Sequence, residues 1–253
     1  MFFDTHAHYD DPRFDGDRDS LLAALPERGV GLVVDCGSDI PTSLSALELS
    51  RRYPHVYCAC GIHPESAGEY TEEDLARVER LCREEKVVAV GEIGLDYHYE
   101  DVPREIQQKA FRMQMRLAKE LGLPVIVHER EAHGDGLQIV DEFPGVTGVF
   151  HCFSGSAEFA LELVRRGWYI GFTGVLTFKN ARRAVEAAQS VPLDRILIET
   201  DCPYMAPEPF RGRRCDPRLV RFTAQKLAEI RGILPDEAAE ITLENACRLF
   251  AIH

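Results

Sequence analysis

The sequence predicts a closed (β/α)8 barrel, an α/β fold in which eight parallel strands alternate with helices. Short apolar runs alternate with longer amphipathic stretches along the whole chain, and eight such runs occur. The length of 253 residues is close to the ~250 residues of a typical barrel. We therefore expect a single domain over residues 1–253. An open doubly wound sheet is the alternative, but the chain has no Gly-x-Gly-x-x-Gly phosphate loop to support it.

Several of the predicted strands are continuous apolar runs, such as Gly31-Leu32-Val33-Val34, rather than alternating ones. Continuous runs are typical of parallel strands that are covered on both faces. The eight predicted strands are Phe2–His6, Gly31–Cys36, Val56–Gly61, Val87–Gly91, Pro124–His128, Gly148–His151, Trp168–Phe172 and Arg195–Glu199.

Helix signals lie between these strands. Thr71 precedes three acidic residues, which is typical of a helix N-terminus because the cap and the helix dipole both favour it. Ser154 or Ser156 can cap a helix that ends near Gly167. The remaining predicted helical stretches are Asp17–Arg28, Arg104–Leu121 between Pro103 and Gly122, Pro217–Arg231 and Pro235–Phe250.

Composition limits the partners of the chain. The formal net charge is −13, so the protein as a whole is not an electrostatic match for a nucleic-acid backbone or an anionic membrane. A polyanionic substrate would need metal ions or a local basic patch. The 8 cysteines form no Cys-x-x-Cys pair, and no secretory signal or long apolar run occurs. We expect a cytoplasmic protein with reduced thiols, no membrane contact and no obligate protein partner.

Metal-ligating residue types recur where the predicted strands end. His6 and His8 alternate along the first strand, so their side chains share one face, roughly 6–7 Å apart. In a barrel, the carboxyl ends of all strands meet at one mouth, where active sites are built. Six residues with good ligand side chains are therefore expected there: His6, His8, Glu92, His128, His151 and Asp201.

Six ligands exceed the need of one tetrahedral zinc ion, so a two-metal site is the sharper hypothesis. Imidazole and carboxylate ligands suit Zn, Mn or Fe, and a carboxylate can bridge two ions. Simpler explanations stay open for single residues. His128 could be a core histidine, and Asp201 could be a turn residue before Pro203. His63 could be a plain loop residue or a residue that supports the metal ligands without binding the ion.

Six motifs, spread in order over nearly the whole chain, resemble those of the TatD family of metal-dependent hydrolases, within the amidohydrolase-like barrel superfamily. They are Asp4-Thr5-His6-Ala7-His8, Gly61-Ile62-His63-Pro64, Gly91-Glu92-Ile93-Gly94-Leu95-Asp96-Tyr97, Pro124-Val125-Ile126-Val127-His128, His151-Cys152-Phe153-Ser154-Gly155 and Glu199-Thr200-Asp201-Cys202-Pro203-Tyr204.

The resemblance implies two divalent ions, Zn, Mg or Mn. It places His6, His8 and Asp201 on one ion and His128 and His151 on the other, with Glu92 bridging. Family members are described as 3′–5′ deoxyribonucleases, and some relatives as D-aminoacyl-tRNA deacylases. We expect a metal-activated water to cleave the phosphodiesters of single-stranded DNA, with Asp201 as general base. A metal-dependent ester or amide hydrolase, and a non-catalytic metal-stabilised binding module, are the alternatives.

Substrate contacts are expected from residues near the same mouth: His63, Arg130, Tyr204, Arg211 and Arg213, with Arg214 and Phe210 nearby. The chain departs from the family pattern in two places. Cys215-Asp216-Pro217 stands where the family usually has Asn-Glu-Pro, and Glu129 stands where Ser is common. Both departures bear on substrate preference rather than on metal binding.

Overall fold

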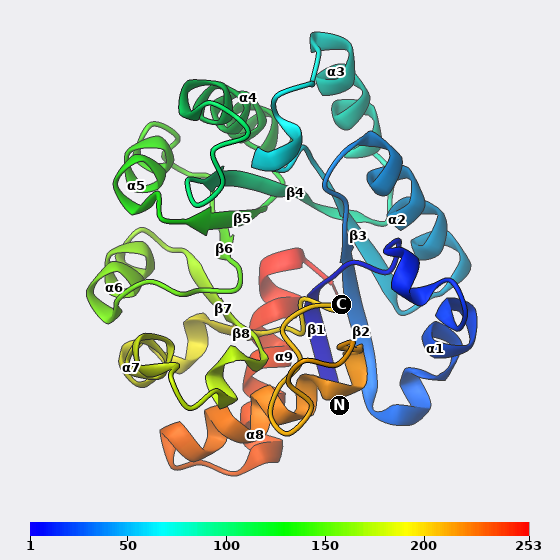
Figure 1. Cartoon of the computed structure of the whole chain (residues 1–253), viewed down its shortest axis with the longest axis vertical. Coiled ribbons are helices and arrows are strands. Elements are labelled where there is room, and N and C mark those ends of the chain that lie inside the picture. Colours follow the sequence, from blue (N-terminus) through cyan, green and yellow to red (C-terminus); the bar gives the residue numbers. More distant parts are fainter. Residues whose placement is uncertain (253) are drawn as a thin grey trace.

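The predicted barrel is confirmed. The computed structural model describes residues 1–252, and its eight strands form one parallel sheet in chain order from β1 to β8. Figure 1 looks onto the mouth of this barrel, with the helices around its outside. The strands are β1 (Phe2–Ala7), β2 (Val30–Cys36), β3 (Val56–Cys60), β4 (Val87–Asp96), β5 (Val125–Arg130), β6 (Gly148–Phe150), β7 (Tyr169–Phe172) and β8 (Ile196–Ile198).

The barrel closes just beyond β8 rather than along it. Ala7 forms a parallel bridge with Cys202, four residues after the end of β8. The N–H of Asp201 donates to the carbonyl of His6 at 2.9 Å, and the N–H of His8 donates to the carbonyl of Cys202 at 2.8 Å. These long-range hydrogen bonds fix Asp201 beside the two histidines of the first strand.

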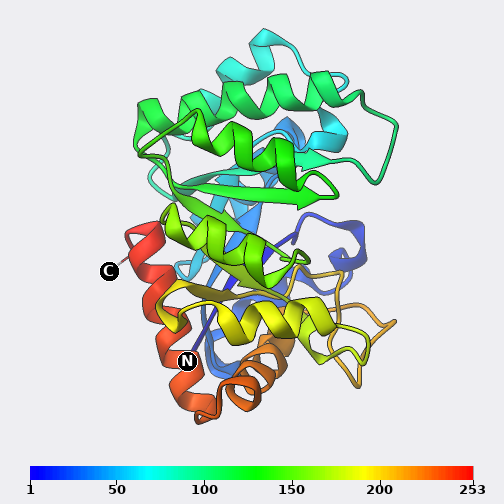
Figure 2. The same cartoon turned by 90° about the vertical axis from the view of Figure 1, so that its left-hand side faces the viewer.

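Helices pack around the outside, as Figure 2 shows from the side. Within the described residues they are α1 (Arg18–Ala24), α2 (Ile40–Arg52), α3 (Glu72–Leu81), α4 (Arg104–Leu121), α5 (His133–Asp141), α6 (Ala157–Arg165), α7 (Arg182–Ser190), α8 (Val220–Arg231) and α9 (Pro235–Phe250). Short 3-10 turns include η2 (Pro26–Arg28), η3 (Pro64–Ser66) and η6 (Pro217–Leu219). None of the helices in residues 1–252 has the length and apolar character to span a bilayer.

The predicted helix signals are largely observed. Thr71 and Asp74 form a capping box on α3, and Gly122 ends α4 in the left-handed conformation at φ 69°. Ser156, not Ser154, caps α6. The predicted stretch 17–28 is split, because Pro26 cannot continue α1 and begins η2 instead.

Alternation along the strands separates two cores. Val34, Ile126, Val149 and Leu197 belong to a cluster that also contains residues of α9, whereas their neighbours along the strands belong to a larger cluster with the outer helices. The first cluster therefore fills the barrel interior, and α9 covers the end where the strands begin. Residues two positions further along these strands face the same interior, above this core and at the mouth.

Candidate metal centre

The interior-facing positions at the mouth are those of the predicted ligands. His128 lies two residues after Ile126, His151 two residues after Val149, and Asp201 four residues after Leu197. The prediction for Glu92 needs a correction, because β4 does not end at Gly91 but continues to Asp96, pairing with β5 as far as Arg130. Gly94, at φ 141°, permits this: a Cβ there would lie 2.0 Å from the carbonyl oxygen of His128.

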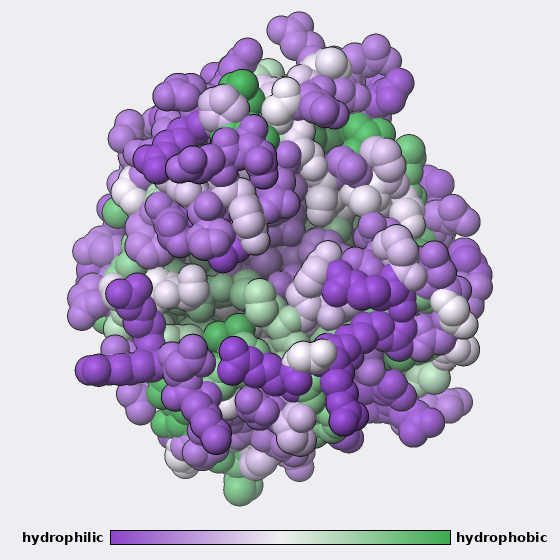
Figure 3. All heavy atoms as spheres, in the orientation of Figure 1, coloured by the Kyte–Doolittle hydropathy of each residue, from purple (hydrophilic) through white to green (hydrophobic). Residues whose placement is uncertain are grey.

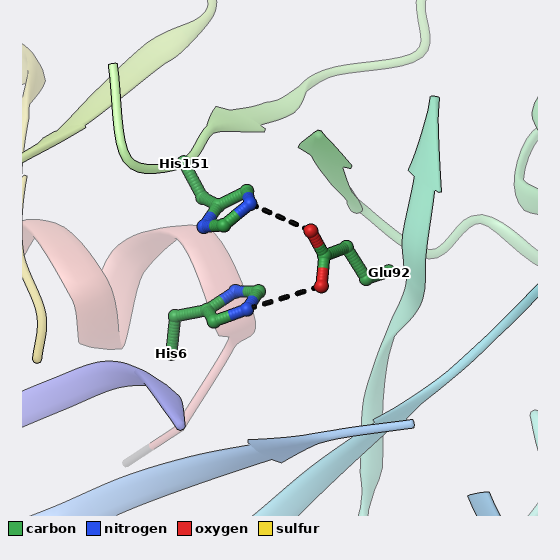
Figure 4. Close-up of side chains that lie close together, drawn as sticks. All are labelled: His6, Glu92 and His151. Carbon is green, nitrogen blue, oxygen red and sulfur yellow. Dashed lines mark ion pairs between the residues drawn. The ribbon is translucent and has the colours of Figure 1, made fainter. Parts of the chain in front are cut away.

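Glu92 stands at the centre of the cluster and faces two sets of histidine nitrogens. Its Oε2 lies 3.3 Å from His6 Nε2 and 3.6 Å from His8 Nε2. Its Oε1 lies 2.7 Å from His151 Nε2 and 2.9 Å from His128 Nδ1. Figure 4 shows the carboxylate between His6 and His151, one oxygen toward each ring. Glu92 can therefore offer one oxygen to each set of histidines.

Asp201 completes the half of the cluster that contains His6 and His8. Its Oδ1 lies 3.5 Å from His8 Nε2 and 3.8 Å from His6 Nε2. The Asp201 backbone is in the left-handed region at φ 55°, a strained conformation that the surrounding hydrogen bonds hold. Three groups of ligand atoms are close enough to hold an ion: His6–His8–Asp201, His6–Glu92–His151 and His63–Glu92–His128.

Outer hydrogen bonds turn a nitrogen lone pair of His8 and of His128 toward the cluster. His8 Nδ1 donates to the carbonyl of Cys36 at 2.8 Å, so its Nε2 carries no proton when the ring is neutral. His128 Nε2 lies 2.9 Å from Asp96 Oδ2, which leaves Nδ1 as the inner lone pair. Metal-ligating histidines in proteins are held by such partners. The donor set therefore fits divalent cations.

His151 has a corresponding partner in Glu199, which is fully buried. His151 Nδ1 has no hydrogen-bond partner at close range but lies 3.6 Å from Glu199 Oε1. Glu199 also accepts the backbone N–H of Cys152 and, through Oε2, the hydroxyl of Thr5 at 3.2 Å. Gly171 leaves the space for this carboxylate, because a Cβ there would lie 2.6 Å from Glu199 Oε2.

Sequence reasoning missed Asp96 and Glu199 as partners of the histidines. Both stand in quoted motifs, Asp96 four residues after Glu92 and Glu199 two residues before Asp201. An acidic residue on a buried strand, near a candidate ligand, was the available signal.

His63 is held in the opposite way from the other histidines. Its Nδ1 accepts the N–H of Glu65 at 3.2 Å, so the neutral ring carries its proton on Nε2. That Nε2 lies 3.5 Å from Glu92 Oε1. In this tautomer His63 is a hydrogen-bond donor into the site rather than a metal ligand.

Without metal, protons occupy the cluster. Burial lowers the pKa of His8, but its ion pair with Asp201 and the charge of Glu92 outweigh burial and raise it to about 9. His128 also reaches a pKa of about 9, because Asp96 and Glu92 outweigh its desolvation. Burial lowers the pKa of His6. The 3.1 Å contact between His6 Nε2 and His8 Nε2 is therefore a hydrogen bond in which His8 donates.

The cluster lies at the floor of a cavity of about 600 Å3. Figure 3 shows that this face of the molecule is hollowed near its centre. His63, Arg130 and Tyr204 line the cavity as predicted, and so does Glu129, which pairs with His133. Seven carboxylates line it as well: Asp10, Asp11, Glu65, Glu92, Asp96, Glu129 and Asp201.

The arginine run after Asp201 does not line this cavity. Arg211 lies over the ring of Phe178, 4.2 Å from its centroid, and Arg213 lines a separate hollow. Arg214 forms an ion pair with Asp17 at 2.6 Å. The departure at 215–216 is also away from the cavity lining: Cys215 is buried, and Asp216 binds Arg218 at 2.8 Å.

A (β/α)8 barrel whose mouth carries converging histidines and carboxylates is the architecture of a metal-dependent hydrolase. The profile of the family described as "TatD related DNase" matches residues 3–251, and the chain belongs to this family. It is a TatD-family metal-dependent hydrolase, as the motifs predicted.

Curated relatives share the full length of the chain. An uncharacterized metal-dependent hydrolase, YabD of Bacillus subtilis, is 45% identical over 100% of both chains. The "3'-5' ssDNA/RNA exonuclease TatD" of Cronobacter sakazakii is 36% identical, over 98% of this chain and 97% of that protein. The crystal structure of YjjV, a TatD homologue from Escherichia coli, superposes with a TM-score of 0.94 at 34% identity, over 100% of this chain and 98% of that one.

Proposed function

We propose that the protein is a 3′–5′ exonuclease that cleaves phosphodiester bonds of single-stranded DNA with two divalent ions, Zn, Mg or Mn. The observation that carries this proposal is Glu92, whose two carboxylate oxygens face separate sets of ligand atoms. In this arrangement His6, His8 and Asp201 would hold one ion and His128 and His151 the other, and Glu92 would offer one carboxylate oxygen to each. The named activity of the Cronobacter relative supports the substrate class.

Bound metal would supply a water of lowered pKa and charge to neutralise the phosphate. The protein's own groups do the rest. Burial raises the pKa of Asp201, but its ion pair with His8 and the neighbouring histidines lower it below the ordinary value, so Oδ1 is ionised and can accept the proton of the attacking water. The Nε2–H of His63 points into the same space and can donate to a phosphate oxygen.

Two half-exposed tyrosines that line the cavity are suited to contact the end of a single DNA strand. Tyr204 is 45% exposed and Tyr99 is 46% exposed, and both line the cavity. An arginine lies over each ring: Arg13 is 4.2 Å from the Tyr204 centroid and Arg130 is 5.2 Å from the Tyr99 centroid. Exposed aromatic faces can stack bases, and the adjacent guanidinium groups can contact phosphates.

A metal-dependent deacylase, acting on an aminoacyl ester such as D-aminoacyl-tRNA, is the second candidate. The carboxylates that line the cavity favour it, because Glu129, Asp10 and Glu65 would attract the ammonium group of an aminoacyl ester and repel a run of phosphates. Under either function we place the protein in the cytoplasm, and the eight free cysteines support that location.

The test is degradation of single-stranded DNA during a metal titration, with each end of the strand labelled in turn, beside an aminoacyl ester. We expect release of nucleotides from the 3′ end. The Asp201→Asn variant should lose roughly 10²–10⁴-fold in rate, as general-base removal does. Cleavage of the ester with intact strands would replace the nuclease with the deacylase. Metal binding and stabilisation without any turnover would favour a binding module instead.

A further inference from the structure

A second hollow, of about 310 Å3, lies on the side of α8 and is lined mainly by arginines. Five of its lining residues are arginines, contributed by η2, by the loop after β8, by η6 and by α8: Arg28, Arg213, Arg214, Arg218 and Arg221. The chain as a whole has a net charge of −13, so this gathering of one sign of charge runs against the composition.

Two of the five arginines are neutralised and three are not. Arg214 is paired with Asp17, and Arg218 with Asp216. Among residues 1–252, Arg28, Arg213 and Arg221 form no ion pair, and all three are exposed. Three uncompensated guanidinium groups around one hollow repel each other, and an anion with several charges would relieve that repulsion. Guanidinium groups are also well suited to phosphate oxygens.

The arginine pocket adjoins the mouth of the barrel through a short series of contacts. Tyr204 lines the metal cavity, and the guanidinium of Arg13 lies over its ring, 4.2 Å from the centroid. Arg214, which lines the arginine pocket, donates to the carbonyl of Arg13 at 2.8 Å. A strand leaving the metal cavity past Tyr204 would therefore cross Arg13 and reach the arginine pocket next.

We propose that the arginine pocket binds internucleotide phosphates of the same single strand whose end lies at the metal centre, an inference that rests on the proposed nuclease function. Phe210 also lines the pocket, and its ring packs on Phe222 with centroids 5.4 Å apart. Single-strand binding sites combine a basic groove with aromatic faces in this way. The pocket thereby supplies the basic surface that the acidic cavity lacks.

The test compares two double variants that remove the same charge. Arg213→Gln with Arg221→Gln alters the pocket, whereas Arg80→Gln with Arg116→Gln alters exposed arginines on α3 and α4. For a strand of about 20 nucleotides, long enough to span both sites, we expect the pocket variant to raise KM about tenfold. Its salt dependence should become shallower by about 1.4 in log–log slope, because two phosphate contacts are lost. For bis(p-nitrophenyl) phosphate, which reaches only the metals, kcat and KM should not change.

An equal rise in KM for both substrates would overturn the proposal, because the arginines would then act through the metal centre. A strand KM no different from that of the control variant would overturn it as well. If the wild-type protein cleaves no strand, the nuclease proposal fails. Strand binding at the arginine pocket is then tested separately, by fluorescence anisotropy of a labelled strand with the wild type and both double variants. Strand binding lost only in the pocket variant supports the pocket, and absent or equal binding in the wild type and both variants refutes it.

Discussion

Metal binding should release protons, and the pH dependence of metal affinity follows from the geometry of the cluster. His8 and His128 each have a pKa of about 9 in the metal-free protein, because carboxylates surround them. At pH 7 both rings are therefore protonated, and an imidazolium has no lone pair to offer a cation. In the proposed arrangement His8 and His128 belong to different ions, so each ion has to displace the proton of its own histidine before that ring can coordinate.

The magnitude follows from the two pKa values. At pH 7 the protonated form of each ring exceeds the neutral form by about 100 to 1. Proton competition at His8 and His128 therefore lowers the overall association constant for the two ions by at least about 10⁴-fold. Below pH 9 this overall affinity should rise at least about 100-fold for each pH unit. Between pH 6 and pH 8 the gain from these two rings alone is about 10⁴-fold, or roughly 5.5 kcal/mol.

Isothermal titration calorimetry with zinc, in buffers of different ionisation enthalpy, counts the protons directly. We expect two protons released per protein at pH 7 from His8 and His128, and fewer as the pH rises past 9. A third comes from His151, because burial lowers its pKa but Glu92 and Glu199 raise it well above the ordinary value. His55→Gln is the control, because His55 Nε2 donates to the carbonyl of Leu22 far from the cluster, and this variant should release the same number. Heats that do not depend on the buffer, or a slope below one decade per pH unit, would show that the carboxylates do not hold protons on these rings.

Three further predictions concern the residues around the ligands. Asp96→Asn and Glu199→Gln should each weaken zinc binding about 10–100-fold in a chelator competition, since each removes the charge that orients a histidine. Glu129→Gln, at the same cavity but bonded to His133, should not; equal losses in all three variants would count against this reasoning. Gly171→Ala should lower the free energy of unfolding in urea by about 1–3 kcal/mol, because the new methyl meets the Glu199 carboxylate, while Gly16→Ala, with open space around it, should not. Glu92→Ala should reduce bound metal below two equivalents by elemental analysis; an unchanged single ion in both proteins would exclude the two-metal arrangement.

Local pattern was enough to predict the strands and the face on which each ligand lies. A strand has a side-chain period of two, so Ile126 and His128, or Val149 and His151, must share a face whatever the rest of the chain does. Parallel strands in a barrel end at one mouth, so the six candidate ligands had to approach one another there. The extent of β4 was not predictable in this way, because its last four residues, from Ile93 to Asp96, are held by pairing with β5.

The state of each histidine was decided by the tertiary structure alone. His63 and His128 are the same residue type, and their ring centroids lie 4.5 Å apart. A backbone N–H at Nδ1 leaves His63 with a proton that faces the site, whereas a carboxylate at Nε2 leaves His128 with an inward lone pair. Such partners are set by contacts across the barrel, like the hydrogen bond between Thr5 and Glu199, which lie 194 residues apart.

The path of the loop after Asp201 was also beyond the sequence. Nearness in the chain to a ligand suggested that Arg211 and Arg213 would line the mouth. The loop has no periodic pattern, and two contacts fix its course. Arg214 forms an ion pair with the distant Asp17, and the Cys215 N–H donates to the carbonyl of Pro203 across the loop itself. These contacts hold Arg213 at the arginine pocket. The path of a loop is set by such contacts, because a loop has no periodic hydrophobic pattern from which its course could be predicted.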